Sequence, residues 1–228
     1  MGSQVVIDIE TIPNMDVADL LPEPQPDSRL KDPVKVAADI EKKKEKATGG
    51  MSLDPNFGRV CVVGYAERRN GEIVAWDHWL AETTDDAERE LLNAFWESAR
   101  EYRKIATFNG AGFDIPFLLR RSWLLDVKPS RVFETVLWKC ATGEANHIDA
   151  RLALSGGDAR AKGTMDLFSR LKFGKGKTDG MDGSQVWPAW QDGRVEEVRA
   201  YCREDCVRTL ELLESLYGYY LPEVCNEQ

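Results

Sequence analysis

The sequence predicts an α/β fold in which helices pack on a mixed β-sheet. Three observations support this prediction. An apolar, β-branched run opens the chain, Asn70-Gly71 joins two further apolar segments as a hairpin turn, and helical and strand patterns alternate afterwards. The chain has 228 residues, of which 43% are hydrophobic. This length and composition suit a single domain over residues 1–228 that carries an insertion at about residues 14–52.

The first predicted strand carries two acids on one face. Residues 5–11 are Val-Val-Ile-Asp-Ile-Glu-Thr, a composition typical of a central strand that is buried on both faces. Because residues i and i+2 of a strand point the same way, Asp8 and Glu10 should lie side by side. Two buried like charges need compensation, and the usual compensation is a divalent metal with oxygen ligands. The alternative is a strand end whose acids face solvent.

The insertion interrupts the pattern after this strand. Its prolines predict a loop over residues 14–32, and Asp32-Pro33 then predicts the start of a helix that ends before Gly49-Gly50. Lysines cluster at residues 42–46 of this helix. We interpret the cluster as a solvated helix face, and the alternative is an arm that contacts phosphates beside the site.

The remaining elements are predicted from their periodicity. Strands are expected over residues 59–68, 72–80 and 104–108. A helix is expected to begin at a capping box formed by Asp85 and Glu88, with its apolar stripe over residues 87–99. The last helix is expected over residues 194–217.

Two further acids occupy notable positions in these elements. Asp114 lies in the first turn of a helix that follows a strand and a glycine-containing loop, where backbone can approach a ligand closely; a simple helix cap is the alternative. Asp205 falls on the apolar face of the last helix, and Tyr201 lies one turn before it. An acid on a buried stripe needs a partner.

These three segments resemble the motifs of the DEDD exonucleases, which share the ribonuclease H-like fold. The segments are D-I-E-T at residues 8–11, N-G-A-G-F-D at residues 109–114 and Y-C-R-E-D at residues 201–205. The spacing from Tyr201 to Asp205 resembles the tyrosine subclass, because Ala200 stands where the histidine subclass has histidine. Residues 109–118 are similar to the proofreading domain of family-B DNA polymerases. Residues 176–184 resemble a loop of stand-alone polymerase-B-like exonucleases of bacteria and phages.

The resemblance implies a 3′→5′ exonuclease with two divalent ions, Mg²⁺ or Mn²⁺, about 3.5–4 Å apart. It implies that Asp8 bridges both ions, that Glu10 and Asp205 complete one, and that Asp114 holds the other. One ion would generate the attacking hydroxide and the second would stabilise the leaving 3′ oxygen, while Tyr201 would orient the water. The candidate substrate-binding residues are Thr11, Asn109, Phe113 and Lys177.

The expected partner is nucleic acid, with single-stranded DNA or 3′ DNA ends favoured and nucleoside 5′-monophosphates released. A 3′→5′ exoribonuclease and a catalytically silent nucleic-acid-binding subunit are the alternatives. The net charge of −9 argues against binding through bulk charge, although a few phosphates can still be held locally. No apolar run reaches 18 residues, so no membrane span is expected. Five scattered cysteines without C-x-x-C spacing indicate reduced thiols in a cytoplasmic protein, which we expect to be monomeric.

Three other patterns receive structural interpretations. His147 and Asp149 are taken as structural, because the chain has two histidines and no evident nucleophile partner for them. Cys202 and Cys206, four residues apart on the last helix, are assigned to helix packing rather than metal binding. Gly176-Lys177-Thr178 is rejected as an ATP phosphate loop, because Leu171 stands where the first glycine is required.

Overall fold

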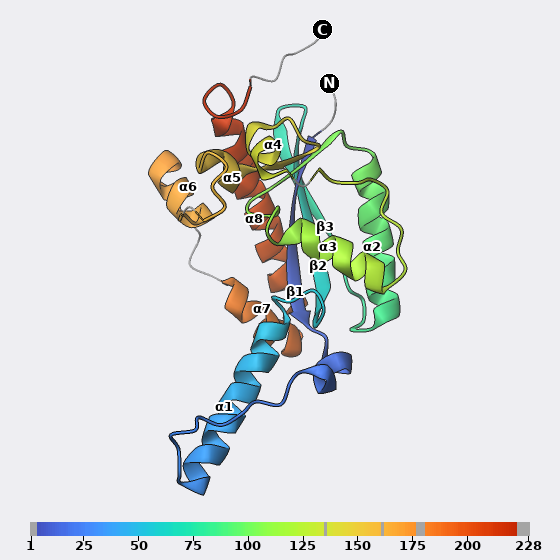
Figure 1. The fold of residues 1–228 in the computed structure, drawn as a ribbon. Helices are drawn as coiled ribbons and strands as arrows, with labels where there is room; N and C mark the ends of the chain where they lie inside the picture. Colours follow the sequence, from blue (N-terminus) through green and yellow to red (C-terminus); the bar gives the residue numbers. More distant parts are fainter. Residues whose placement is uncertain (1–3, 135, 161, 177–180, 223–228) are drawn as a thin grey trace.

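A five-stranded mixed sheet forms the centre of the computed structural model, which describes residues 4–134, 136–160, 162–176 and 181–222 (Figure 1). The strand order is β3-β2-β1-β4-β5. β2 runs antiparallel to β1 and to β3, whereas β4 runs parallel to β1 and to β5. The strands are β1 (Gln4–Pro13), β2 (Gly58–Arg69), β3 (Glu72–Trp79), β4 (Lys104–Thr107) and β5 (His147–Asp149). The predicted mixed sheet with packed helices is confirmed.

Helices cover this sheet on both faces (Figure 1). They are α1 (Pro33–Met51), α2 (Asp85–Arg100), α3 (Asp114–Leu124), α4 (Leu137–Thr142), α5 (Ala150–Leu154), α6 (Met165–Phe173), α7 (Val186–Gln191) and α8 (Val195–Leu216), with 3₁₀ turns at Met15–Leu20 and Gly183–Gln185. Among the described residues, no helix has the length and apolar character needed to cross a membrane. The four described cysteines, Cys61, Cys140, Cys202 and Cys206, are free and buried.

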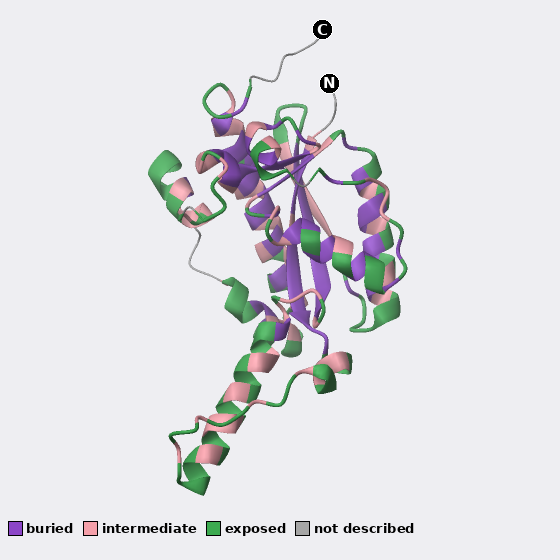
Figure 2. Cartoon of the chain, viewed as in Figure 1, coloured by how far each residue is buried: buried purple, intermediate pink, exposed green. Residues whose placement is uncertain are grey.

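β1 is the central strand, and its two faces pack against different helices. Val5 and Ile7 belong to a core cluster with Phe95 of α2, whereas Val6 belongs to a cluster with Leu213 of α8. Because side chains alternate along a strand, the even-numbered residues of β1 face the α8 side. β1 and β2 are almost continuously buried (Figure 2). The prediction of a central strand buried on both faces is therefore confirmed.

The segment between β1 and β2, which the sequence pattern predicts to be an insertion, contains α1 and the loop before it, and these project from the body of the molecule (Figure 1). The predicted helix start is confirmed, since the Asp32 side chain accepts a hydrogen bond from the Val34 amide and Pro33 occupies the first turn. The predicted end before Gly49-Gly50 is wrong, because the helix continues to Met51. Met51 is 1% exposed, and burying it offsets the roughly 1 kcal/mol that each helical glycine costs relative to alanine.

Glu88 does not form the predicted capping box. Thr84 caps α2 through its hydroxyl instead, while Glu88 is fully buried. Its carboxylate accepts hydrogen bonds from Arg59 of β2, from the Val60 amide and, at 2.9 and 2.7 Å, from Arg121 of α3. A buried carboxylate requires such partners, so this cluster joins β2, α2 and α3.

We predict that Glu88→Gln destabilises the protein by roughly 3–5 kcal/mol, because it removes the fully buried carboxylate that two buried arginines share and leaves them only the more exposed Asp16 and Asp85. Chemical denaturation measures the loss. Glu90→Gln, which alters an exposed acid on the same helix, is the control and should change stability by less than about 0.5 kcal/mol. Equal stability of the two variants would show that Glu88 does not hold these elements together.

Candidate active site

Four acids and one tyrosine converge on the α8 face of β1 from three separate elements. Asp8 and Glu10 come from β1, Asp114 begins α3, and Tyr201 and Asp205 come from α8. Burial raises the pKa of Asp8 well above its usual range, and the neighbouring charges of Asp114, Glu10 and Asp205 raise it further. The structure thus brings together all four acids that the sequence motifs identified.

Glu10 lies at an irregularity of β1. The strand register with β2 shifts between Glu10 and Thr11, which is the signature of a β-bulge. Bulges re-aim side chains at the end of regular pairing. The Glu10 side chain nevertheless belongs with that of Asp8, since their carboxylate oxygens and the Cys202 sulfur lie within 4.8 Å of one another.

Asp114 is held against β1 by a hydrogen bond rather than serving as a helix cap. Its Oδ1 accepts from the Ile9 amide at 3.1 Å, and the N-cap position of α3 belongs to Phe113, which makes no side-chain cap. Burial raises the pKa of Asp114 to about 7, although the Ile9 amide and its own amide favour the carboxylate. The Ile9 contact fixes α3 next to the two acids of β1.

Asp149, which the sequence interpretation treated as structural, orders the loop before α3. Its two carboxylate oxygens each accept a backbone amide at 3.0 Å, one from Asn109 and one from Ala111. The same side chain caps α5 through the amides of Arg151 and Leu152. Sequence reasoning missed this role in positioning the loop, because the contact joins residues about 40 positions apart.

α8 approaches the sheet closely at Gly64, the residue directly opposite Asp8 on β2. A Cβ at Gly64 would lie 2.8 Å from the Cys202 sulfur and 2.9 Å from the Cys206 sulfur. The packing role predicted for these two cysteines agrees with this contact. Cys202 also donates to the Asp8 carbonyl at 3.4 Å, so its thiol joins the last helix to the acidic strand.

Tyr201 is a half-buried neighbour of these acids. Burial is the largest cause that raises the pKa of its phenol far above the usual range. The negative charges of Asp205, Glu10 and Asp8 raise this pKa further. The phenol therefore stays protonated at neutral pH. It is able to donate a hydrogen bond and is not available as a general base.

This set of side chains fits divalent metal ions. Crowded carboxylates repel one another where they are shielded from water, and a divalent cation with oxygen ligands removes that repulsion. Asp8 and Glu10 already place ligand atoms near one another, together with the Cys202 sulfur. Burial raises the pKa of the Cys202 thiol, which keeps it protonated, so the carboxylates are the better ligands for Mg²⁺ or Mn²⁺.

The structure places the predicted substrate-binding residues in different settings. The Thr11 hydroxyl donates to the Ser52 carbonyl at 2.6 Å, which gives it a structural role at the base of α1. Asn109 is exposed in the loop before α3, where its side chain accepts from Arg151. The ring of Phe113 packs 5.5 Å from that of Phe117. Lys177 lies outside the described residues.

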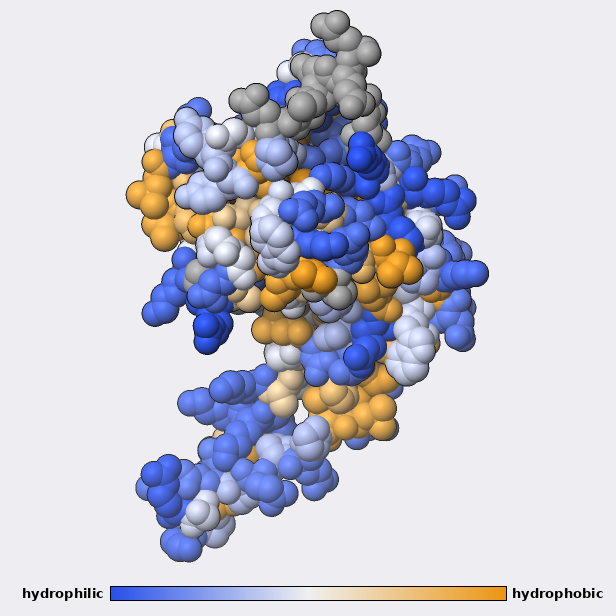
Figure 3. Space-filling view, turned by 45° about the horizontal axis from the view of Figure 1, so that its top comes forward, coloured by the Kyte–Doolittle hydropathy of each residue, from blue (hydrophilic) through white to orange (hydrophobic). Residues whose placement is uncertain are grey.

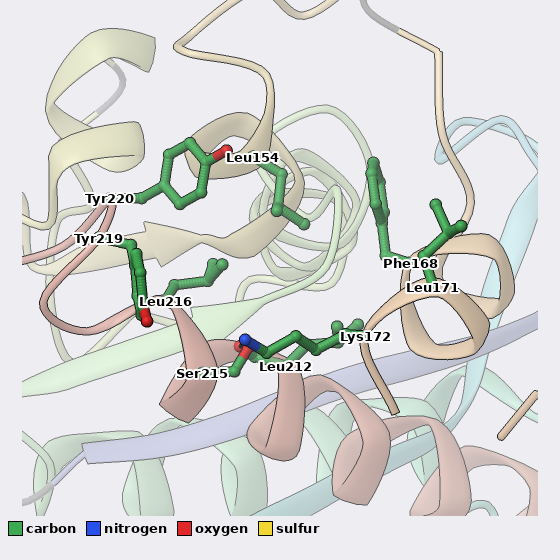
Figure 4. Close-up of a pocket in the computed structure, with 9 residues that line it drawn as sticks. All are labelled: Leu154, Phe168, Leu171, Lys172, Leu212, Ser215, Leu216, Tyr219 and Tyr220. Carbon is green, nitrogen blue, oxygen red and sulfur yellow. Dashed lines mark hydrogen bonds between the residues drawn. The ribbon is translucent and has the colours of Figure 1, made fainter. Parts of the chain in front are cut away.

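An apolar pocket of about 270 Å³ lies between α6 and the C-terminal end of α8 (Figure 4). Lys172 and Tyr219 lie at this pocket, with the Lys172 ammonium 5.5 Å from the centre of the Tyr219 ring. None of its described lining residues is an acid. The pocket is therefore separate from the acidic cluster.

Comparison with known proteins identifies the family. Residues 53–214 match a family model described as a predicted 3′-5′ exonuclease related to the exonuclease domain of PolB. The chain belongs to this family. Asp114, Tyr201 and Asp205 fall inside the match, while Asp8 and Glu10 precede it.

The fold is similar to that of a solved polymerase. The family B DNA polymerase from the hyperthermophilic archaeon Pyrobaculum calidifontis matches with a TM-score of 0.60 and 15% sequence identity. The match covers 95% of this chain and 24% of the polymerase chain. At this identity the similarity shows the fold, and it confirms the predicted ribonuclease H-like architecture of polymerase-B exonucleases.

We predict that the acidic cluster makes the metal-free protein less stable as pH rises. The folded-state pKa of Asp114, about 7, exceeds the ordinary value of 3.8, so the folded state binds more protons between these values. This contribution to stability is complete below the ordinary pKa and is lost as pH rises through about 7. The pKa of Asp8 is also raised in the folded state, so Asp8 likewise lowers the stability of the metal-free protein as pH rises.

Thermal melts in chelator, from about pH 4 to about pH 7, measure this effect against Asp114→Asn. The variant retains an acceptor for the Ile9 amide but has no charge, so the parent should lose stability relative to it as pH rises. Added Mg²⁺ or Mn²⁺ should remove much of the difference. Parallel pH profiles of the two proteins in chelator would contradict the assignment of a raised pKa to Asp114.

We also predict that Gly64→Ala destabilises the protein by roughly 1–3 kcal/mol, because the added methyl meets both sulfurs of α8. Gly49→Ala is the control, since its Cβ would meet nothing within 4 Å. Combining Gly64→Ala with Cys202→Ala should cost less than the sum of the two single changes. Additive losses in denaturation experiments would show that the close approach at Gly64 is unimportant.

Proposed function

We propose that this chain is a 3′→5′ exonuclease that hydrolyses single-stranded DNA from its 3′ end and releases nucleoside 5′-monophosphates. The observation that supports the proposal is the clustering of four acids from three elements around Asp8, where neighbouring acids raise its pKa. We propose that two Mg²⁺ or Mn²⁺ ions are held by these acids, which are Asp8, Glu10, Asp114 and Asp205. When bound, such ions supply an activated water and stabilise the leaving 3′ oxygen.

The residues of the chain have distinct tasks in this proposal. Asp8 occupies the centre of the cluster, and the Ile9 amide keeps Asp114 directed at it. The phenol of Tyr201, which lies beside the Asp205 carboxylate, keeps its proton. It would use this proton to donate the hydrogen bond that orients the attacking water. Asn109 and Phe113, which flank the glycines before α3, contact the terminal nucleotide. The presence of all four acids and Tyr201 favours an enzyme over a catalytically silent binding subunit.

Incubation with 5′-labelled single strands tests the proposed reaction. A DNA strand should shorten progressively from its 3′ end in Mg²⁺ or Mn²⁺, and chelator or Asp8→Asn should stop the reaction. An RNA strand of the same sequence, run in parallel, distinguishes the exoribonuclease alternative. Endonucleolytic products, or full activity in chelator, would overturn the proposal.

We predict that Tyr201→Phe slows turnover by about 10²-fold, because the attacking water loses its hydrogen-bond donor. Metal affinity, measured by calorimetry, should stay close to that of the parent, since a protonated phenol is not a ligand of the ions. Tyr217→Phe is the control, as this tyrosine bonds to Gln4 at the start of β1. If Tyr201→Phe were as fast as the parent, Tyr201 would have no part in the mechanism.

A further inference from the structure

α1 stands beside the acidic cluster and points away from it. The Thr11 hydroxyl, one residue after Glu10, binds the carbonyl of Ser52, the residue that follows α1. Met51 is buried at the same end of the helix. From this base the helix projects beyond the body of the molecule (Figure 1). Its direction is therefore fixed with respect to the acids of β1.

One side of α1 packs against the loop before it. Lys43 donates hydrogen bonds of 2.8 Å to the Gln25 carbonyl and to Asp39, and Asp39 in turn accepts from the Asp27 amide. Val36, Ile40 and Ala47 are partly buried on this side. These contacts hold the projecting segment together. They also give the Lys43 ammonium partners within the protein, so Lys43 is not counted as a phosphate-binding residue.

Three other lysines form a separate stripe along α1. At 100° per residue, Lys35, Lys42 and Lys46 fall within about 40° of one another around the helix axis. All three are exposed, and within the described part of the chain none of them forms an ion pair. Lys44 points about 180° from Lys35, so it lies off this stripe.

The stripe is exceptional in an acidic protein. α1 holds five lysines and three acids, so its net charge is +2 while the chain carries −9. Figure 3 shows the projecting segment as a largely hydrophilic surface. Lys35 and Lys46 are separated by about 16 Å along the helix, and a stacked strand with one phosphate per ~3.4 Å presents about five phosphates over that length.

We infer that the Lys35–Lys42–Lys46 stripe binds the phosphate backbone of the nucleic-acid strand whose 3′ end enters the acidic cluster. The inference rests on the proposed function for the identity of the strand. A strand that leaves the cluster along α1 meets Lys46 first, then Lys42 and then Lys35. The stripe supplies a local attraction for phosphate that the chain's net charge of −9 does not provide.

Salt dependence of binding tests this inference. A fluorescent 20-nucleotide single strand is titrated with the full-length parent and the triple variant K35Q/K42Q/K46Q, in chelator so that no hydrolysis occurs. Three lost phosphate contacts should lower the slope of log affinity against log salt by about 2. The parent's affinity advantage should therefore shrink by about 16-fold between 50 and 200 mM salt.

A charge-matched variant separates the stripe from overall charge. K44Q/R103Q/K128Q removes three positive charges from exposed positions that lie off the stripe. Its slope should stay near that of the parent. Equal slopes for the parent and the stripe variant, or equal losses in both triple variants, would overturn the inference.

A failure of the stripe inference is distinguishable from a failure of the proposed exonuclease function. The stripe variant should hydrolyse a dinucleotide at the parent's rate, because so short a substrate, about 7 Å, does not extend along α1. Failure of the parent to hydrolyse any nucleic acid would refute the proposed function, while the binding slopes would still decide whether the stripe holds a strand.

Discussion

The crowding of carboxylates around Asp8 is the constraint on which the arrangement of this protein depends. Asp8 sits on the central strand, where burial and three neighbouring acids all raise its pKa. To bring these acids together, the fold needs the first strand of the chain, the start of α3 and the middle of α8. The Ile9 amide, the glycine opposite Asp8 and the Cys202 thiol each fix one of these elements against another.

Three buried acids outside the cluster are compensated by the protein itself. Glu88 receives two arginines, the buried side chain of Asp77 pairs with Arg199 and Arg203, and Asp149 accepts backbone amides. Asp8 instead has acids as its charged neighbours. Since a buried charge without compensation is costly, this contrast separates acids that the protein itself compensates from acids that the proposed metal ions would compensate.

The sequence was sufficient for four of the five strands, the hairpin, the last helix and the clustering of the four acids, because these follow from local periodicity and from three motifs, whereas the short strand β5 has no such signal. It was insufficient where long-range contacts override local signals. Glu88 has the spacing of a capping residue, but two arginines from distant elements draw it into the core. Gly49 and Gly50 predict a helix end, yet α1 continues to Met51 because burial of the Met51 side chain stabilises the last turn. The assignment of Thr11 to substrate did not foresee its bond to Ser52, 41 residues away.

The two halves of the acidic cluster come from segments that the insertion separates. The family match begins at residue 53, while Asp8 and Glu10 lie before the insertion. Residues Val6 to Pro13 of β1 pair with β2, and this pairing places Asp8 opposite Gly64. The position of Asp8 and Glu10 in the sheet is therefore set by strand pairing and not by the length of the segment between β1 and β2. Lengthening a loop costs little free energy once its ends are fixed. The segment between β1 and β2 is therefore able to carry an additional surface, such as the lysine stripe, without disturbing the acids of β1.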